Sequence, residues 1–298
     1  MVFIMGKMIN LNYPLAIIDV GSNSVRLMFT DGIKSDKKLI TTKLASGFDK
    51  FFNLSLNSII TTVNAINLLK EDAISRGAKS VYVFATEAVR KAKNKDEFIK
   101  TVKDVCLLDV DVVSGDLEAK LAVMGALSNS TGVVIDIGGA SSEIALSIDG
   151  DIKYNKSYKI GAVTLSELSK NTKFNSEIYL KDIFNEGEDY SLYTCKCIGG
   201  TACALACIDL KLKVYNPKLI HNHTISLTSL KQIKAMLYKM TALEISNNFA
   251  VPLSRAEIIY QGVSIIVKML ENYNINKIIV SESDNLEGYL KHIEGKKC

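Results

Sequence analysis

The chain has 298 residues, of which 48% are hydrophobic and 23% charged, and a formal net charge of +4 at pH 7. This length and composition predict an ordered globular protein of about two domains. The small positive charge is spread along the chain, which argues against a nucleic-acid-binding protein, and no apolar run reaches the ~18 residues of a membrane span. Because the first residues lack a charged-then-apolar signal pattern, we expect a cytoplasmic protein.

The first half predicts a three-stranded meander followed by alternating helices and strands. Residues 15–19, 24–30 and 38–44 are strand-like, with Asp31-Gly32 as a hairpin turn. The other expected elements are a helix over 55–76 closed by Gly77, a strand at 80–85, a helix capped by Thr86, a strand at 109–113 and a helix over 117–128.

The second half repeats this order with extra helices. The expected elements are strands near 133–137, 143–148, 152–158 and 194–198, a helix opening at 199, helices over 226–248 and 255–271, a strand at 277–281 and a terminal helix. Two copies of one order imply two α/β domains with mixed sheets, residues 1–128 and 129–298. The terminal helix could pack back on the first domain.

The same short pattern ends the first strand of each half. IIDVGSNS at 17–24 and IDIGGASSE at 135–143 run from an apolar strand through aspartate and glycine to hydroxyl residues, 117 positions apart (136 − 19). Glycine lets the backbone approach a phosphate, and amides and hydroxyls donate to it. Asp19, Asp136 and Glu143 are then candidate magnesium ligands. Tight hairpins without a ligand are the alternative, but the repetition favours a phosphate clamp in a cleft between the domains.

Three further features have two interpretations each. Glu118 at a helix start is either a reactive carboxylate or a complement to the helix dipole, and Arg90 either binds phosphate or forms an ion pair. Gly199-Gly200-Thr201 opens a helix whose amides could bind a third phosphate. Four cysteines between 195 and 207 favour buried reduced thiols over a zinc site.

Seven segments together resemble the exopolyphosphatase/guanosine pentaphosphate phosphohydrolase (Ppx/GppA) family, within the superfamily of actin, sugar kinases and heat-shock chaperone ATPases. The segments are AIIDVGSNSVRL (16–27), ATEAVRKAKN (85–94), VSGDLEAKLAVMGAL (113–127), VVIDIGGASSEIAL (133–146), KIGAVTLSEL (159–168), IGGTACALA (198–206) and SRAEIIYQG (254–262). The resemblance implies two duplicated ribonuclease-H-like (actin-like ATPase) domains, each a mixed sheet flanked by helices, with a cleft between them.

The resemblance also implies roles for individual residues. Glu118 falls at the catalytic glutamate that activates water, and Asp136 and Glu143 fall at positions that bind Mg²⁺ or shape the site, with Mn²⁺ as the alternative metal. Arg26 and Arg255 fall where arginines face the cleft and a bound nucleotide. The positions expected to hold phosphate are Ser22, Asn23, Ser24, Arg90, Gly138, Gly139, Ser141 and Ser142, with Gly200 and Thr201 at the third helix start.

The expected reaction is in-line attack of water on a terminal phosphoryl group of polyphosphate or guanosine pentaphosphate, as in the stringent response. The chain resembles the short, two-domain form, as a monomer or homodimer. It departs from the family pattern at Ala140, which is expected to crowd the second loop, at Ser46, and in SESDNLEGYL (281–290). A guanosine tetra- or pentaphosphate sensor without catalysis is therefore an alternative. An ATP-dependent kinase or filament ATPase is another, against which SGDLEAKLA (114–122) argues.

Overall fold

The computed structural model describes residues 12–46, 52–128 and 130–295. The chain divides into two compact units, one formed by the residues up to Gly125 together with those from Asn285, the other by Ala126 to Asp284. Each unit has its own sheet; the buried hydrophobic residues form two clusters in unit 1 and one in unit 2. The predicted domain boundary borders residue 129, which lies outside the described residues. Among the described helices, none combines the length and hydropathy of a membrane-crossing segment.

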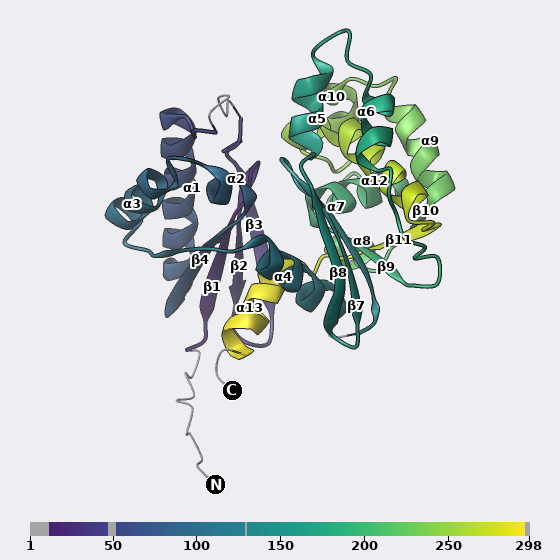
Figure 1. Ribbon diagram of the computed structural model, residues 1–298. Coiled ribbons are helices and arrows are strands. Elements are labelled where there is room, and N and C mark those ends of the chain that lie inside the picture. The colour runs from purple at the N-terminus through teal and green to yellow at the C-terminus, as the bar shows by residue number, and fades with distance from the viewer. Residues whose placement is uncertain (1–11, 47–51, 129, 296–298) are drawn as a thin grey trace. The chain divides into compact units, whose positions relative to one another are not determined.

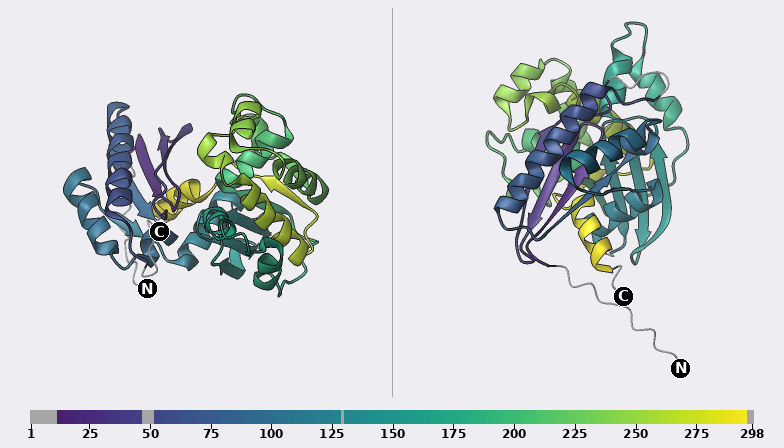
Figure 2. Two further views of the ribbon diagram at one scale, coloured as in Figure 1. Left: turned by 90° about the horizontal axis from the view of Figure 1, so that it is seen from above. Right: turned by 90° about the vertical axis from the view of Figure 1, so that its left-hand side faces the viewer.

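Unit 1 consists of a five-stranded sheet with helices on both faces (Figures 1 and 2). Its elements are β1 (Leu15–Val20), β2 (Ser24–Thr30), β3 (Ser35–Thr41), α1 (Leu56–Ser75), β4 (Ser80–Ala85), α2 (Glu87–Lys91), α3 (Lys95–Cys106), β5 (Val110–Val112), α4 (Gly115–Leu127) and α13 (Asn285–Gly295). The strand order is β3-β2-β1-β4-β5, with β1 antiparallel to β2 and parallel to β4. The third strand begins and ends three residues before the predicted 38–44.

Alternation of side chains along β1 assigns its residues to two cores. Ala16 and Ile18 belong to the core built with α1 and α3, whereas Leu15 and Ile17 belong to the one built with α4 and α13. Figure 2, right, shows α1 and α3 in front of the first of these faces. Asp19 follows in the same alternation, so its carboxylate lies on the α4 face of the sheet.

Local signals explain where α1 begins and ends. The Ser55 side chain accepts from the N–H of Ser58 at the start. At the end, Gly77 has a φ of +90° and its N–H donates to Ile74 O (2.9 Å), while the N–H of Ala78 donates to Ala73 O (3.0 Å). This is a Schellman motif, and it confirms Gly77 as the predicted cap. Thr86 precedes α2 as predicted, but its side chain makes no capping hydrogen bond.

The helix α13 packs on the α4 face of the first sheet. The Tyr289 ring stacks on Phe84 with centroids 4.5 Å apart, and Tyr289 Oη donates to Asp111 Oδ2 at 3.0 Å. A Cβ added at Gly288 would lie 1.9 Å from Leu121 O, so α13 approaches α4 more closely than any side chain at this position allows.

Unit 2 repeats the plan around a six-stranded sheet (Figure 1). Its elements are β6 (Gly132–Ile137), β7 (Ser142–Ile148), β8 (Asp151–Tyr158), α5 (Ala162–Ser169), α6 (Ser176–Ile183), β9 (Cys195–Ile198), α7 (Gly199–Asp209), α8 (Pro217–Ile220), β10 (Thr224–Ser226), α9 (Leu227–Leu237), α10 (Ala242–Asn248), α11 (Leu253–Ala256), α12 (Ile259–Asn272) and β11 (Lys277–Val280).

The order β8-β7-β6-β9-β11-β10 reproduces the first sheet and adds one edge strand. The directions also agree, because β6 is antiparallel to β7 and parallel to β9. The predicted α/β fold with two duplicated mixed sheets is therefore confirmed. The prediction of one helix over 226–248 was wrong, because Thr241 and Glu244 form a capping box that starts α10 as a new helix.

The cysteines between 195 and 207 lie in the core of unit 2. All four are buried and free of disulfides, packed with residues of α7, α9 and α12. Burial raises the pKa of the Cys195 thiol to about 12, so this side chain is protonated at neutral pH. The sixth cysteine, Cys298, lies outside the described residues.

Candidate active site

The loop after β1 is a tight turn held from outside by the segment that follows β3. Gly21 N–H donates to Ser24 O at 3.1 Å, and Asn23 O accepts from the N–H groups of Thr42 and Lys43 at 3.0 and 2.9 Å. Ser22, Asn23 and Ser24 are 7–9% exposed. Within the described part of the chain no hydrogen bond uses the side chains of these three residues, so their donors are available to an anion.

Asp19 and Arg26 form an ion pair at the end of β1. They are direct partners in the β1–β2 register, which puts both side chains on the α4 face of the sheet. Arg26 Nε donates to Asp19 Oδ2 at 3.0 Å, and Arg26 Nη2 contacts the same oxygen. Asp19, predicted as a metal ligand, thus has one carboxylate oxygen bound to a guanidinium.

Arg90 joins α2 to α4 through three acceptors. Its Nη1 donates to Val113 O at 2.9 Å and to Glu118 Oε2 at 2.8 Å, and its Nη2 donates to Glu87 Oε2 at 2.5 Å. Although burial acts to lower the pKa of Arg90, the two carboxylates raise it, so the guanidinium stays charged. Arg90, a predicted phosphate ligand, therefore also orients Glu118.

Glu118 lies in the first turn of α4, which Ser114 caps by accepting from the N–H of Leu117 at 3.1 Å. Its side chain is 12% exposed. Burial raises the pKa of Glu118 from 4.5 to about 7; Arg90 opposes the rise, and the charges of Asp19 and Glu87 add to it. A carboxyl group that titrates near neutral pH suits proton transfer, because both of its forms are populated there.

The loop after β6 repeats the turn of the first unit. Gly138 N–H donates to Ser141 O at 3.0 Å, 117 positions after the equivalent bond of Gly21 (138 − 21). The N-terminal amides of α5 hold the loop, since the N–H of Val163 donates to Gly139 O at 2.9 Å. A Cβ on Gly161 would lie 2.5 Å from Gly139 backbone atoms. This contact explains the glycine of the KIGAVTLSEL segment.

Three residues of this loop differ in what they can offer. The hydroxyl of Ser142 is buried and donates to Ile160 O at 2.6 Å, so it supports the strand pair instead of facing a ligand. Ser141 is 4% exposed, and its hydroxyl bonds to no described residue. Ala140 does not adopt a positive φ. The backbone here therefore does not require glycine, although crowding of a phosphate by the Ala140 methyl group stays a prediction.

Asp136 and Glu143 face each other across β6 and β7. They are direct partners in the antiparallel register, and Glu143 Oε1 accepts from Ser157 Oγ on β8 at 2.8 Å. Two carboxylates in this arrangement repel one another and favour a cation, and Mg²⁺ commonly takes one or two carboxylates together with substrate phosphates. The chemistry of two neighbouring carboxylates suits such an ion, and metal binding at this pair stays a prediction. No cluster of three or more His, Cys, Asp or Glu side chains occurs among the described residues.

The start of α7 explains the Gly199-Gly200-Thr201 motif by three close contacts. Gly199 has a φ of +80°, and a Cβ there would lie 2.7 Å from Asp136 Oδ1. A Cβ at Gly200 would lie 2.6 Å from Arg255 Nη2, so the guanidinium rests on the first turn of the helix. Thr201 is buried, and its Oγ1 donates to Ile137 O at 3.1 Å. The Arg255 guanidinium thus lies against the first turn of α7, and anion binding there stays a prediction, whereas Thr201 ties α7 to β6.

The structure therefore brings the predicted residues together in two sets. Each set lies at the carboxyl ends of parallel strands, β1, β4 and β5 in unit 1 and β6, β9 and β11 in unit 2. Sequence reasoning missed Glu87, which is 5% exposed and binds Arg90 and Lys91. Its spacing of three and four residues from two cations was the available signal.

Comparison with known proteins gives consistent matches. Residues 30–297 match the family model described as the Ppx/GppA phosphatase family. The bifunctional 3-dehydroquinate synthase/phosphatase of Fusobacterium nucleatum is 28% identical over 96% of this chain and 47% of its own length. The guanosine-5'-triphosphate,3'-diphosphate pyrophosphatase of Photobacterium profundum is 26% identical over 94% of this chain and 59% of its own.

A solved structure agrees over nearly the full length of both chains. The crystal structure of the Aquifex aeolicus Ppx/GppA family member superposes with a TM-score of 0.76 at 26% identity, covering 95% of this chain and 98% of that chain. The chain spans about half to three fifths of the length of the two curated relatives named above.

Proposed function

Because this chain belongs to the Ppx/GppA phosphatase family, we propose that it is a phosphohydrolase that releases the terminal phosphate of guanosine pentaphosphate or of inorganic polyphosphate. The observation that carries the proposal is the Glu118 carboxyl group. It lies at the carboxyl end of the first sheet, bound to Arg90, with a pKa raised to about 7. Both its position and its acidity suit a general base.

In the proposed reaction Glu118 removes a proton from the attacking water. The ionised carboxylate accepts the proton through an oxygen, and the water oxygen attacks the terminal phosphorus in line with the leaving phosphate. Arg90 fixes the carboxylate so that it need not reorganise during the transfer. The leaving group is itself a phosphate, so no second acid is required to protonate it.

Phosphate oxygens are bound in this proposal by the two turns and by the start of α7. Ser22, Asn23 and Ser24 supply side-chain donors from the first turn, and Ser141 supplies one from the second. Arg255 and the N-terminal amides of α7 add positive charge. Ser142 and Thr201, whose hydroxyl protons are used internally, hold the geometry of the second turn and of α7.

Asp136 and Glu143 would hold Mg²⁺ in this enzyme. The ion would neutralise charge on the phosphate oxygens as it builds up in the transition state. Asp19 has its Oδ2 atom bonded to Arg26, and its predicted part in metal binding stays a prediction.

The relatives favour a guanosine substrate, since the Photobacterium profundum protein is named for guanosine-5'-triphosphate,3'-diphosphate. We therefore place guanosine pentaphosphate first and polyphosphate second. The geometry of the turns suits both, because both present a terminal phosphoanhydride.

A phosphate-release assay with both substrates and Mg²⁺ tests the proposal. Glu118→Gln keeps the side-chain shape and should lower kcat by about 10²- to 10⁴-fold. Asp116→Asn, an exposed acidic residue of the same helix turn, is the matched control and should retain activity. Unchanged turnover in Glu118→Gln would refute the assignment. Tight binding of guanosine pentaphosphate without release by the wild type would instead support a sensor, and sugar-stimulated ATP turnover a kinase.

A further inference from the structure

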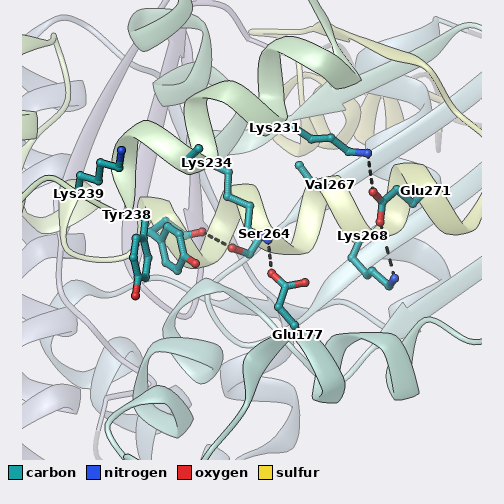
Figure 3. A pocket seen from close by; sticks show the side chains of 11 residues that line it. Glu177, Lys231, Lys234, Tyr238, Lys239, Ser264, Val267, Lys268 and Glu271 are labelled. Atoms are coloured by element: carbon teal, nitrogen blue, oxygen red, sulfur yellow. Dashed lines mark hydrogen bonds and ion pairs between the residues drawn. The ribbon is translucent and has the colours of Figure 1, made fainter.

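We propose that unit 2 carries a second ligand site, separate from the candidate active site, that binds a nucleoside polyphosphate through its base and its phosphates. The site is a surface pocket of about 520 Å³ lined by α6, α9 and α12 (Figure 3). We refer to it as the α9–α12 pocket. The proposal rests on its charge, on its exposed aromatic pair and on its position on α12.

The pocket has an excess of positive charge. Four ammonium groups and two carboxylates line it, a net charge of +2 (4 − 2), from Lys231, Lys234, Lys239, Lys268, Glu177 and Glu271. Lysines that line one concavity attract phosphate groups. An excess of two positive charges complements the two or more negative charges of a nucleoside di- or triphosphate.

Ion pairs hold three of these lysines around the pocket (Figure 3). Lys231 Nζ lies 2.7 Å from Glu271 Oε1, and Lys268 Nζ lies 3.7 Å from the other oxygen of the same carboxylate. Lys234 pairs with Glu177 of α6. Two carboxylates therefore form ion pairs with three lysines. Lys239, the fourth lysine of the pocket, has no ion-pair partner in the described part of the chain. Lys239 is the cation best placed to bind a phosphate without breaking an existing pair.

A pair of tyrosines forms one end of the pocket. Tyr238 at the end of α9 is 75% exposed, and its ring centroid lies 5.7 Å from that of Tyr260 on α12, with 48° between the ring planes. Neither ring stacks on a third one among the described residues. An exposed aromatic ring beside lysines is the combination that binds nucleic-acid bases, because every base has a π-face to stack.

The pocket uses a different face of α12 from the one that supports the candidate active site. Tyr260, Ser264 and Lys268 follow at intervals of four residues and line the pocket. Gly262 points inward, where a Cβ would lie 2.5 Å from Thr201 Cγ2 at the start of α7. The two sites are therefore distinct, and they share one helix.

The absence of tryptophan from the sequence makes a direct test possible. Tyr238→Trp introduces a single tryptophan at the pocket and keeps a stacking ring. Its fluorescence is followed while GTP, guanosine or inorganic tripolyphosphate is added. Leu192→Trp, at a position 95% exposed in the same unit and outside the pocket, is the matched control. The reporter is local, so the outcome does not depend on whether the chain hydrolyses guanosine pentaphosphate.

We expect saturable quenching by GTP in Tyr238→Trp and none in Leu192→Trp. Tripolyphosphate, which lacks a base to stack, should bind at least about tenfold more weakly, and guanosine, which lacks phosphates, similarly. Adding Lys239→Ala should weaken GTP binding about three- to tenfold. The proposal is overturned if GTP does not quench the fluorescence of Tyr238→Trp, or quenches Leu192→Trp equally. It is also overturned if tripolyphosphate binds as tightly as GTP, or if Lys239→Ala leaves the affinity for GTP unchanged.

Discussion

The raised pKa of Glu118 predicts how activity depends on pH. If the ionised carboxylate is the base, kcat/KM should follow its ionised fraction and rise through pH 7. The sign follows from the cause: burial disfavours the charged form, so the group keeps its proton to a higher pH than an ordinary glutamate and becomes an active base only above about pH 7.

The magnitude follows from the titration curve. With a pKa of about 7, the ionised fraction is about 0.09 at pH 6 and about 0.9 at pH 8, so kcat/KM should rise roughly tenfold between them. With the ordinary value of 4.5, about 97% would already be ionised at pH 6, and the rate would change by only a few per cent. Initial rates of phosphate release at substrate concentrations well below KM measure this ratio directly.

The phosphate groups of the substrate also titrate, so the control must shift the pKa of Glu118 without changing the pKa of the substrate. Glu87→Gln removes a negative charge that raises the pKa of Glu118. It also removes the carboxylate that competes with Glu118 for the Arg90 guanidinium, and both changes lower the pKa of Glu118. The inflection should shift to lower pH in this variant, whereas an inflection of the substrate would stay in place. A flat profile between pH 6 and 8, or an inflection that Glu87→Gln does not move, would refute the assignment of the base.

Three further predictions concern Glu118 and two glycines. The folded-state pKa of Glu118 is raised, so its contribution to the free energy of unfolding is complete below pH 4.5 and is lost as the pH rises through 7. Glu118→Gln should remove this pH dependence, which amounts to up to about 3 kcal/mol (2.5 × 1.36). Denaturant titration at several pH values measures it. Gly161→Ala would place a Cβ 2.5 Å from the Gly139 backbone and should lower the free energy of unfolding by about 1–3 kcal/mol, with reduced phosphate release; an unchanged melting temperature would contradict it. In Gly200→Ala the new Cβ would meet only the flexible end of the Arg255 side chain, at 2.6 Å. The free energy of unfolding should therefore change by less than about 1 kcal/mol, while KM rises about tenfold. An unchanged KM would show that Arg255 does not bind the substrate.

Features that depend on local pattern could be predicted from the sequence. The apolar run before Asp19 and the one before Asp136 are long enough to indicate buried strands, and the glycines that follow give the same turn twice. Gly77 ends α1 because only a residue without a Cβ adopts its φ of +90° at no cost. The start of α10 also has a local signal, because Thr241 and Glu244 have the spacing of a capping box. The apolar periodicity continues across this point, and it led to the wrong prediction of one uninterrupted helix.

Features that depend on side-chain direction could not be predicted. Ser141 and Ser142 are adjacent hydroxyl residues, yet their side chains have different partners. Ser142 Oγ, on the first residue of β7, donates to Ile160 O, whereas the hydroxyl of Ser141, in the loop before the strand, bonds to no described residue. The contact of Arg90 with Glu118 joins residues 28 positions apart. Such a contact depends on how α2 and α4 pack, and no spacing in the sequence encodes it.

The packing of α13 on the first sheet sets an order of folding during synthesis. Unit 2 is contiguous, whereas unit 1 is complete only after α13, which follows all of unit 2 in the sequence, has been synthesised. Until then Leu15, Ile17 and Phe84 lack the cover of Leu286 and Tyr289. Translating the 159 intervening residues (284 − 125) takes roughly 10–30 s, so the nascent first unit exposes an apolar face for that time and is the part of the chain that needs protection from aggregation.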